Sequence, residues 1–164
     1  MQGTIIQINT SLGGLPKRAI PDGMITPLGL EGDRHAHTQI HGGPNKAILL
    51  IASETVDQLK ERGFPLFYGA LGENLTTRGI PLKDLRKGDQ LRAGGALLQI
   101  TLPRIPCRQL DVYGETLKRE LADELIWKHD PSSAYWGMSG FYASVIQPGP
   151  VAPGDIIALV TTLA

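Results

Sequence analysis

The chain of 164 residues lacks any apolar run near the roughly 20 residues that are needed to cross a bilayer. Its first residues show no basic stretch followed by an apolar core, so we expect no secretion signal. A single cysteine, Cys107, cannot form an internal disulfide, which favours a reducing compartment and a cytoplasmic location. The 16 basic residues balance the 16 acidic residues, so the bulk charge provides no attraction to nucleic acid or to membrane surfaces.

Repeats, low-complexity tracts and charged tails are also missing, and the length suits a single domain over residues 1–164. Hydrophobic residues make up 41% and charged residues 20%, as is usual for a globular protein. Glycine and proline are abundant instead, with 20 and 12 residues. They predict many turns, and hence short strands rather than long helices.

Segments rich in β-branched or apolar residues predict strands at residues 3–8, 47–52, 90–92, 96–102, 142–146 and 155–160. One or two more short strands are expected within the Gly- and Pro-rich residues 12–40. About seven strands without a strand–helix alternation predict a mainly β protein. We expect a closed or nearly closed β-barrel, because closure leaves no strand edge exposed.

About two peripheral α-helices are predicted beside the barrel. Ser53 offers an N-cap for a helix over residues 54–62, and Gly63 offers a natural C-terminal cap. A second helix is expected over residues 116–128, where leucines recur every four residues.

The segment from Pro103 to Arg108 is the most distinctive candidate for chemistry. Its two prolines stiffen the chain, and Cys107 stands close to Arg104 and Arg108. Neighbouring guanidinium groups favour a thiolate and lower the pKa of a cysteine. A thiolate can carry sulfur, attack an electrophile or bind a soft metal ion. The alternative is an inert buried cysteine, which is common in protein cores.

Three histidines lie close together in the sequence at His35, His37 and His41. Imidazoles bind zinc, but this spacing does not match a zinc motif that can be derived from ligand geometry. The alternative is that the histidines form local hydrogen bonds or face an anionic ligand.

The loop that follows could bind an anion, because glycines present backbone N–H groups and allow a close approach. A Gly-Gly pair is also often only a turn. With the basic residues near in space, the anion-binding set would be Arg34, Gly42, Gly43, Asn45, Lys46 and Arg104.

Two further features have both a functional and a structural interpretation. Asn74, in the polar segment 72–76, is either a ligand contact or a turn residue bonded to its own backbone. Aromatic residues gather between residues 127 and 142. They suit a core, although some could line the mouth of a pocket for a planar substrate.

Four of these segments together resemble the MOSC (molybdenum cofactor sulfurase C-terminal) domain family, in its short, stand-alone bacterial form. They are His41-Gly-Gly-Pro-Asn-Lys-Ala47, Gly72-Glu-Asn-Leu-Thr76, Pro103-Arg-Ile-Pro-Cys107 and the Gly154-Asp155 turn. They occur in the expected order, and the resemblance covers nearly the whole chain. It implies a MOSC (PK-type) β-barrel with an embedded pocket.

The resemblance also implies a ligand. Cys107 matches the family's functional cysteine, which is a ligand to the metal of the molybdenum cofactor (molybdopterin with a Mo ion) in some members and is thought to carry sulfur in others. By the same matching, Arg104 and the loop from His41 to Lys46 would border the phosphate and the pterin. Asn74 would lie at the same site. Pyridoxal phosphate is not an expected cofactor.

The implied function is the reduction of small N-hydroxylated compounds. One cysteine cannot hold a four-cysteine iron–sulfur cluster, so a redox role needs a separate electron donor. Two alternatives use the same thiolate: a sulfur carrier with a persulfide on Cys107, and a non-catalytic module that binds and delivers the cofactor. A zinc hydrolase is a more remote alternative. The sequence leaves the oligomeric state open.

Overall fold

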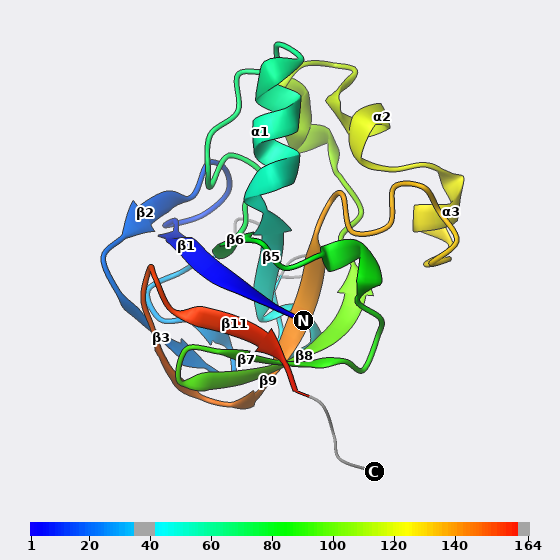
Figure 1. Ribbon diagram of the computed structural model, residues 1–164. Coiled ribbons are helices and arrows are strands. Elements are labelled where there is room, and N and C mark those ends of the chain that lie inside the picture. The colour runs from blue at the N-terminus through cyan, green and yellow to red at the C-terminus, as the bar shows by residue number, and fades with distance from the viewer. Residues whose placement is uncertain (35–41, 161–164) are drawn as a thin grey trace.

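Seven strands of the computed structural model, which describes residues 1–34 and 42–160, close into a barrel (Figure 1). The ring runs β1, β11, β7, β8, β9, β5, β6 and back to β1, and only the β5–β6 pair is parallel. This confirms the predicted mainly β barrel. The barrel strands are β1 (Gln2–Thr10), β5 (Ile48–Ala52), β6 (Leu75–Arg78), β7 (Gln90–Ala93), β8 (Ala96–Pro103), β9 (Phe141–Gln147) and β11 (Ile156–Leu159).

Four short strands lie outside the ring. Strand β2 (Arg18–Ile20) extends the sheet beside β1, while β10 (Gly149–Val151), β3 (Gly23–Thr26) and β4 (Gly29–Leu30) form a small second sheet. The expectation of one or two strands within residues 12–40 was therefore too low, because the described part of this range, residues 12–34, already forms three. No strand was predicted for the polar segment 72–76, yet it enters β6 at Leu75.

The buried strand β5 explains how two cores fit into a small protein. Ile48 and Leu50 face the barrel interior, whereas Leu49 and Ile51 face a second apolar cluster under the helices. Successive side chains of a strand point to opposite faces, so a strand covered on both faces is apolar throughout. This accounts for the continuous apolar run in the sequence.

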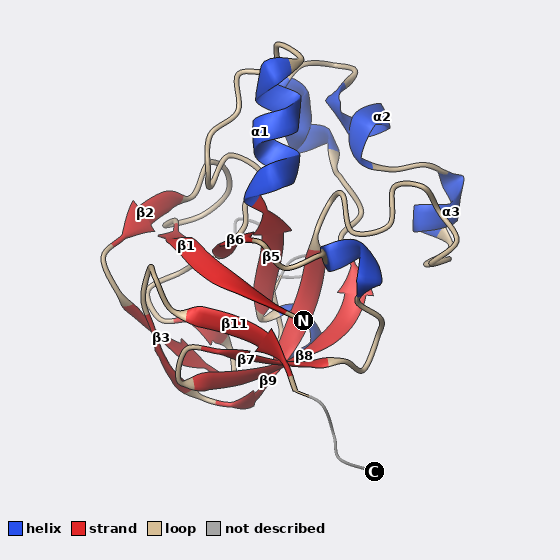
Figure 2. Cartoon of the chain, viewed as in Figure 1, coloured by secondary structure: helices blue, strands red, loops and turns tan. Residues whose placement is uncertain are grey.

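The helices gather at one end of the barrel and beside it (Figure 2). Helix α1 (Ser53–Glu61) matches its prediction, but Ser53 is its first residue rather than its cap, and its hydroxyl accepts a hydrogen bond from Nε of Arg78 at 3.2 Å. The last turn ends before Gly63, whose φ is +97°. Three short 3-10 helices complete the described chain: η1 (Pro44–Lys46), η2 (Leu82–Asp84) and η3 (Arg108–Tyr113).

The prediction of a single helix over residues 116–128 was wrong, because the chain forms two short helices there, α2 (Leu117–Leu121) and α3 (Glu124–Trp127). The leucines of α2 are buried in the cluster under the helices, whereas Ile126 of α3 is buried against the barrel core. The chain must change direction to reach both cores. Asp123 begins the second helix by accepting a hydrogen bond from the backbone N–H of Ile126 at 3.1 Å. Within the described residues, none of the helices has the length and apolar character to cross a bilayer.

Candidate functional site

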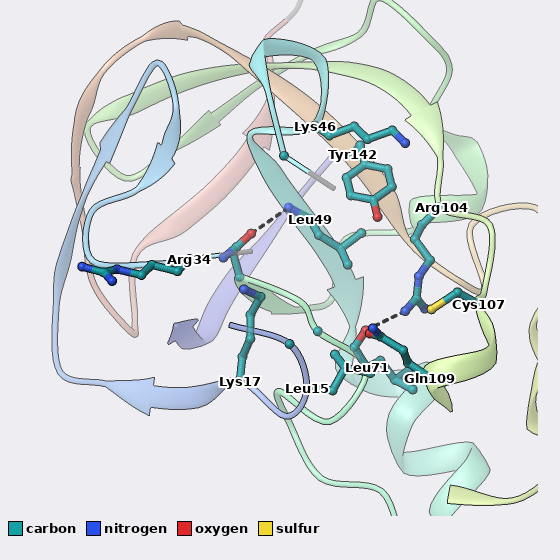
Figure 3. A pocket seen from close by; sticks show the side chains of 14 residues that line it. Leu15, Lys17, Arg34, Lys46, Leu49, Leu71, Arg104, Cys107, Gln109 and Tyr142 are labelled. Carbon is teal, nitrogen blue, oxygen red and sulfur yellow. Dashed lines mark hydrogen bonds between the residues drawn. The ribbon is translucent and has the colours of Figure 1, made fainter. Parts of the chain in front are cut away.

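Cys107 lies on the wall of a narrow cavity at the end of the barrel that carries the helices (Figure 3). Strand β8 ends at Pro103, and the stiff segment behind it brings the cysteine to the N-terminal end of η3. Its carbonyl accepts a hydrogen bond from the backbone N–H of Leu110 at 3.1 Å. The side chain is partly exposed, so the thiol is accessible from the cavity.

Four cations line the same cavity: Lys17, Arg34, Lys46 and Arg104. The cavity has a volume of about 60 Å³. Since one water needs roughly 10–15 Å³ of such space, it has room for an anion the size of phosphate. Gly42 and Gly72 line it with φ values of +86° and +89°, a backbone region that favours glycine.

Arg104 is held rigidly beside Cys107, as Figure 3 shows. The side chain is only 4% exposed, and Nη2 donates to the carbonyl of Leu71 at 2.8 Å. Nη1 donates to the hydroxyl of Ser139 at 3.3 Å, and the backbone N–H of Arg104 donates to the carbonyl of Gly140 at 2.9 Å. A buried guanidinium fixed in this way presents a positive charge without reorganisation.

The ring of Tyr142, from β9, also lines the cavity, with its hydroxyl directed toward the side of Arg104 and Cys107 (Figure 3). Lys46 lies over this ring, with Nζ 5.3 Å from its centroid. Burial raises the pKa of the phenol above its ordinary value of 10.0, although Arg104 acts in the opposite direction. The hydroxyl therefore stays protonated at neutral pH and can donate a hydrogen bond.

A buried network supports the opposite wall. Nζ of Lys17 and Oδ1 of Asp33 are 2.6 Å apart, and both side chains are at least 93% buried. The other oxygen of Asp33 accepts from Nδ2 of Asn74 at 2.9 Å. Oδ1 of Asn74 accepts from the backbone N–H of Leu49 at 3.1 Å, so this residue ties β5 to the cavity wall. Sequence reasoning missed Lys17, since its only signal is a basic residue after the Gly-Gly-Leu-Pro segment.

Glu73 is fully buried next to this wall. Its Oε1 accepts from the backbone N–H of Gly69 at 2.7 Å and from the hydroxyl of Thr76 at 3.1 Å. Among the described residues Oε2 has no hydrogen-bond partner. Burial raises the pKa of this carboxyl above its ordinary value of 4.5, although its hydrogen bonds act in the opposite direction. The buried environment therefore favours the neutral, protonated form of Glu73.

The structure brings together most of the residues that the sequence marked as candidates. On the cavity lie Arg34, Gly42, Lys46, Asn74, Arg104 and Cys107, although the side chain of Arg34 points away from Cys107 (Figure 3). Gly43 and Asn45 do not line it, and the carbonyl of Asn45 instead accepts from the hydroxyl of Thr101 at 2.6 Å. Arg108 lies on a neighbouring groove.

The histidine cluster falls outside the described residues, because His35, His37 and His41 all lie between residues 34 and 42. The zinc alternative and the cofactor contact expected of His41 therefore stay predictions. Over residues 1–34 and 42–160, no group of three or more His, Cys, Asp or Glu side chains is arranged to hold a metal ion.

Comparison with known proteins gives consistent similarities. The sequence model of the MOSC domain matches residues 37–158. The chain is 32% identical over 145 residues to protein YiiM of Escherichia coli K12, covering 86% of this chain and 60% of the relative. It is 33% identical over 132 residues to protein YflK of Bacillus subtilis 168, covering 80% of this chain and 55% of the relative. It therefore spans less than two thirds of the length of either curated relative.

The fold is likewise similar to a solved structure of YiiM. The crystal structure of YiiM from Geobacillus stearothermophilus superposes with a TM-score of 0.71 at 28% identity. The match covers 97% of this chain and 75% of that one.

Proposed function

Because this chain belongs to the MOSC domain family, which is associated with molybdenum cofactor binding, we propose that it binds this cofactor and reduces N-hydroxylated compounds. Electrons come from a separate donor. The observation that carries the proposal is the presence of the chain's one thiol on a single cavity with the buried guanidinium of Arg104 and with Lys46. A soft metal ligand and an anion site so close together suit a cofactor that carries both a metal ion and a phosphate.

The residues present fit the two ends of such a cofactor. The sulfur of Cys107 is a soft ligand for molybdenum, and the fixed guanidinium of Arg104 lines the same cavity. The cavity has room for a phosphate group, with Lys46 and Arg104 to neutralise its charge. The charge of Lys17 is already balanced by Asp33. Gly42 and Gly72 present backbone without a side chain of their own to the cavity, and Leu15 packs closely against Gly72.

The chemistry that the bound cofactor would supply is oxygen-atom transfer from a substrate nitrogen. The chain's own residues bind and orient the reactants. Cys107 would hold the metal end, and Arg104, fixed by its hydrogen bonds, would stabilise negative charge beside it without having to move. The hydroxyl of Tyr142, which keeps its proton at neutral pH, would donate a hydrogen bond to an oxygen atom bound at the same wall.

The test is elemental analysis of gently purified protein from a host whose cofactor biosynthesis is intact. We expect molybdenum and phosphorus near one per chain in the unchanged protein, and a loss of at least about tenfold in Cys107→Ser, because serine is a poor soft-metal ligand. Since Cys107 is partly exposed and not part of the core, the melting temperature should stay nearly unchanged.

Three other outcomes favour the alternatives. A mass increase of one sulfur on Cys107 without molybdenum would support a sulfur carrier. Bound cofactor without any reduction of N-hydroxylated compounds by a chemical electron donor would support a delivery module. A Cys107→Ser protein that melts clearly lower, yet keeps its metal and its activity, would show that the cysteine only fills space.

A further inference from the structure

A broad groove adjoins the cavity on the other side of Cys107. Its walls come from the end of β8, from the segment leading into η3, and from α2 and α3. Four residues line both hollows and so separate them: Lys46, Cys107, Gln109 and Tyr142. The groove has a volume of about 820 Å³. Pockets for small molecules typically measure roughly 300–1,000 Å³, so a whole small molecule fits here with its end at the thiol.

The groove is cationic. Besides Lys46 it is lined by Arg108, Lys118 and Arg119, and its described lining includes no acidic residue. Asp111 lies outside this wall, and its Oδ1 pairs with Nζ of Lys118 at 3.1 Å. The arginines are exposed, which leaves their guanidinium groups accessible to a ligand. A hollow lined by charge of one sign concentrates ligands of the opposite sign.

The groove also carries an aromatic wall. Trp127 is 61% exposed, whereas the chain's other tryptophan, Trp136, is 7% exposed. Leu102, Ile105 and Pro106 add apolar surface on the same groove. An indole that stays exposed beside guanidinium groups is a stacking surface for a flat ring, because arginine and tryptophan both pack against π-systems.

We propose that this groove binds the substrate, and that the substrate is an aromatic N-hydroxylated compound carrying a carboxylate or a phosphate. Its ring packs against Trp127, and its anionic group faces Arg108 and Arg119. The groove thus receives the substrate, and its end at Cys107 adjoins the cavity. The expectation of an N-hydroxyl group rests on the proposed function. The expectation of an aromatic ring with an anionic group rests on the lining of the groove alone.

The test titrates the protein with 4-nitrobenzoate and, as its uncharged counterpart, 4-nitrobenzamide, and follows the quenching of tryptophan fluorescence. We expect the anion to bind about tenfold more tightly, since one charge-assisted contact is worth about that factor. Arg119→Gln should weaken binding of the anion about tenfold and leave the neutral probe unchanged. Arg92→Gln is the matched control, because Arg92 is an exposed arginine on β7 that does not line the groove. Trp127→Phe should remove most of the quenching.

Equal affinity for the two probes, or no effect of Arg119→Gln, would overturn the proposal. The same titration on protein that contains molybdenum and phosphorus tests the occupant. Retained binding supports a separate substrate site, whereas loss of binding would assign the groove to the cofactor and overturn the proposal. If the protein takes up no molybdenum but still binds the anion through Arg119, the groove stands as an anionic-ring site and the proposed function fails by itself.

Discussion

Asp33 accepts three hydrogen bonds inside the protein, from Nζ of Lys17, from the backbone N–H of Ser11 and from Nδ2 of Asn74. Removing one partner of a buried ion pair leaves the other charge without compensation and costs about 3–5 kcal/mol. We therefore expect Asp33→Ala to lower the free energy of unfolding by about that amount in urea denaturation. Adding Lys17→Met should recover part of the loss, because it removes the uncompensated cation.

The exposed pair of Arg62 and Glu120 is the matched control. Its N–O distance is also 2.6 Å, but the two side chains are 49% and 26% exposed. Ion pairs in water contribute only about 0–1 kcal/mol, so Glu120→Ala should have little effect. Similar losses for Asp33→Ala and Glu120→Ala would show that burial does not decide the strength of the inner pair.

Glu73 should make the stability of the protein depend on pH. Burial favours its neutral form, so the pKa in the folded state lies above the ordinary value of 4.5. The folded state then binds more protons than the unfolded state, and stability falls as the pH rises from about 4.5 through the raised pKa. Glu73→Gln keeps an oxygen for Gly69 and Thr76 and does not ionise, so it should gain stability over the unchanged protein as the pH rises.

The measurement is the melting temperature of both proteins from acidic to neutral pH. The difference between them should grow with pH. A difference in melting temperature that stays constant across this pH range would mean that Glu73 is ionised in the folded state or does not contribute to the pH dependence.

At the scale of single residues, the sequence indicated part of the candidate site. Cys107 and Arg104 stood out, because a stiff segment after a strand holds an arginine and a thiol a few residues apart. Lys17 was not predictable, because its burial depends on Asp33, which lies 16 residues further along the chain. The opposite placements of Arg104 and Arg108 could not be predicted either, since they depend on where β8 ends and η3 begins.

At the scale of elements, Gly140 decides how closely β9 approaches β5. Its φ is +84°, and a Cβ at this position would meet the backbone carbonyl of Leu50, which cannot move aside as a side chain could. Its own carbonyl accepts the backbone N–H of Arg104. We expect Gly140→Ala to cost about 2–5 kcal/mol, from left-handed backbone strain and overpacking together. It should also loosen the site beside Cys107.

A substitution at Gly63 separates the backbone strain from the overpacking. Its φ is +97°, but an added Cβ would meet nothing within 4 Å. Gly63→Ala should therefore show the backbone strain alone, about 1–2 kcal/mol. The two losses in the free energy of unfolding, for Gly140→Ala and for Gly63→Ala, are to be measured by urea denaturation. A Gly140→Ala protein no less stable than Gly63→Ala would contradict the close contact between the strands.

The elements themselves were predictable where burial leaves a pattern. The apolar run of β5 and the alternation in β8 and β9 indicated strands correctly. The leucine spacing over residues 116–128 predicted one helix, because spacing reports which side chains are buried and not that two cores receive them. Strand β6 was missed because its two pairing partners, β1 and β5, both lie far from it in the sequence and supply the hydrogen bonds.

At the scale of the whole molecule, the ring closes through contacts between the first and last of the described strands, β1 and β11. Gln2, Gly3 and Thr4 of β1 pair with Ala158, Ile157 and Ile156 of β11. Nothing local in either segment indicates this pairing, so the sequence predicted closure from the general cost of an exposed edge and from the family resemblance. Because each strand of a closed ring has two neighbours, loss of one closing contact should weaken the whole barrel and not only its end.

Neighbouring isoleucines in β11 test this cooperativity. Ile157 is fully buried in the barrel core, whereas Ile156 is 57% exposed. We expect Ile157→Ala to lower the free energy of unfolding by about 2–5 kcal/mol, and Ile156→Ala to change it by no more than about 0.5 kcal/mol.

In a Trp127→Phe background, fluorescence reports on Trp136, which packs against Phe141 of β9 with ring centroids 5.3 Å apart. Its transition in Ile157→Ala should coincide with the loss of β-structure seen by circular dichroism, since a closed barrel unfolds as one unit. If the circular dichroism signal fell first while Trp136 kept its native emission, β11 would be a separable end of the chain and closure would not stabilise the rest.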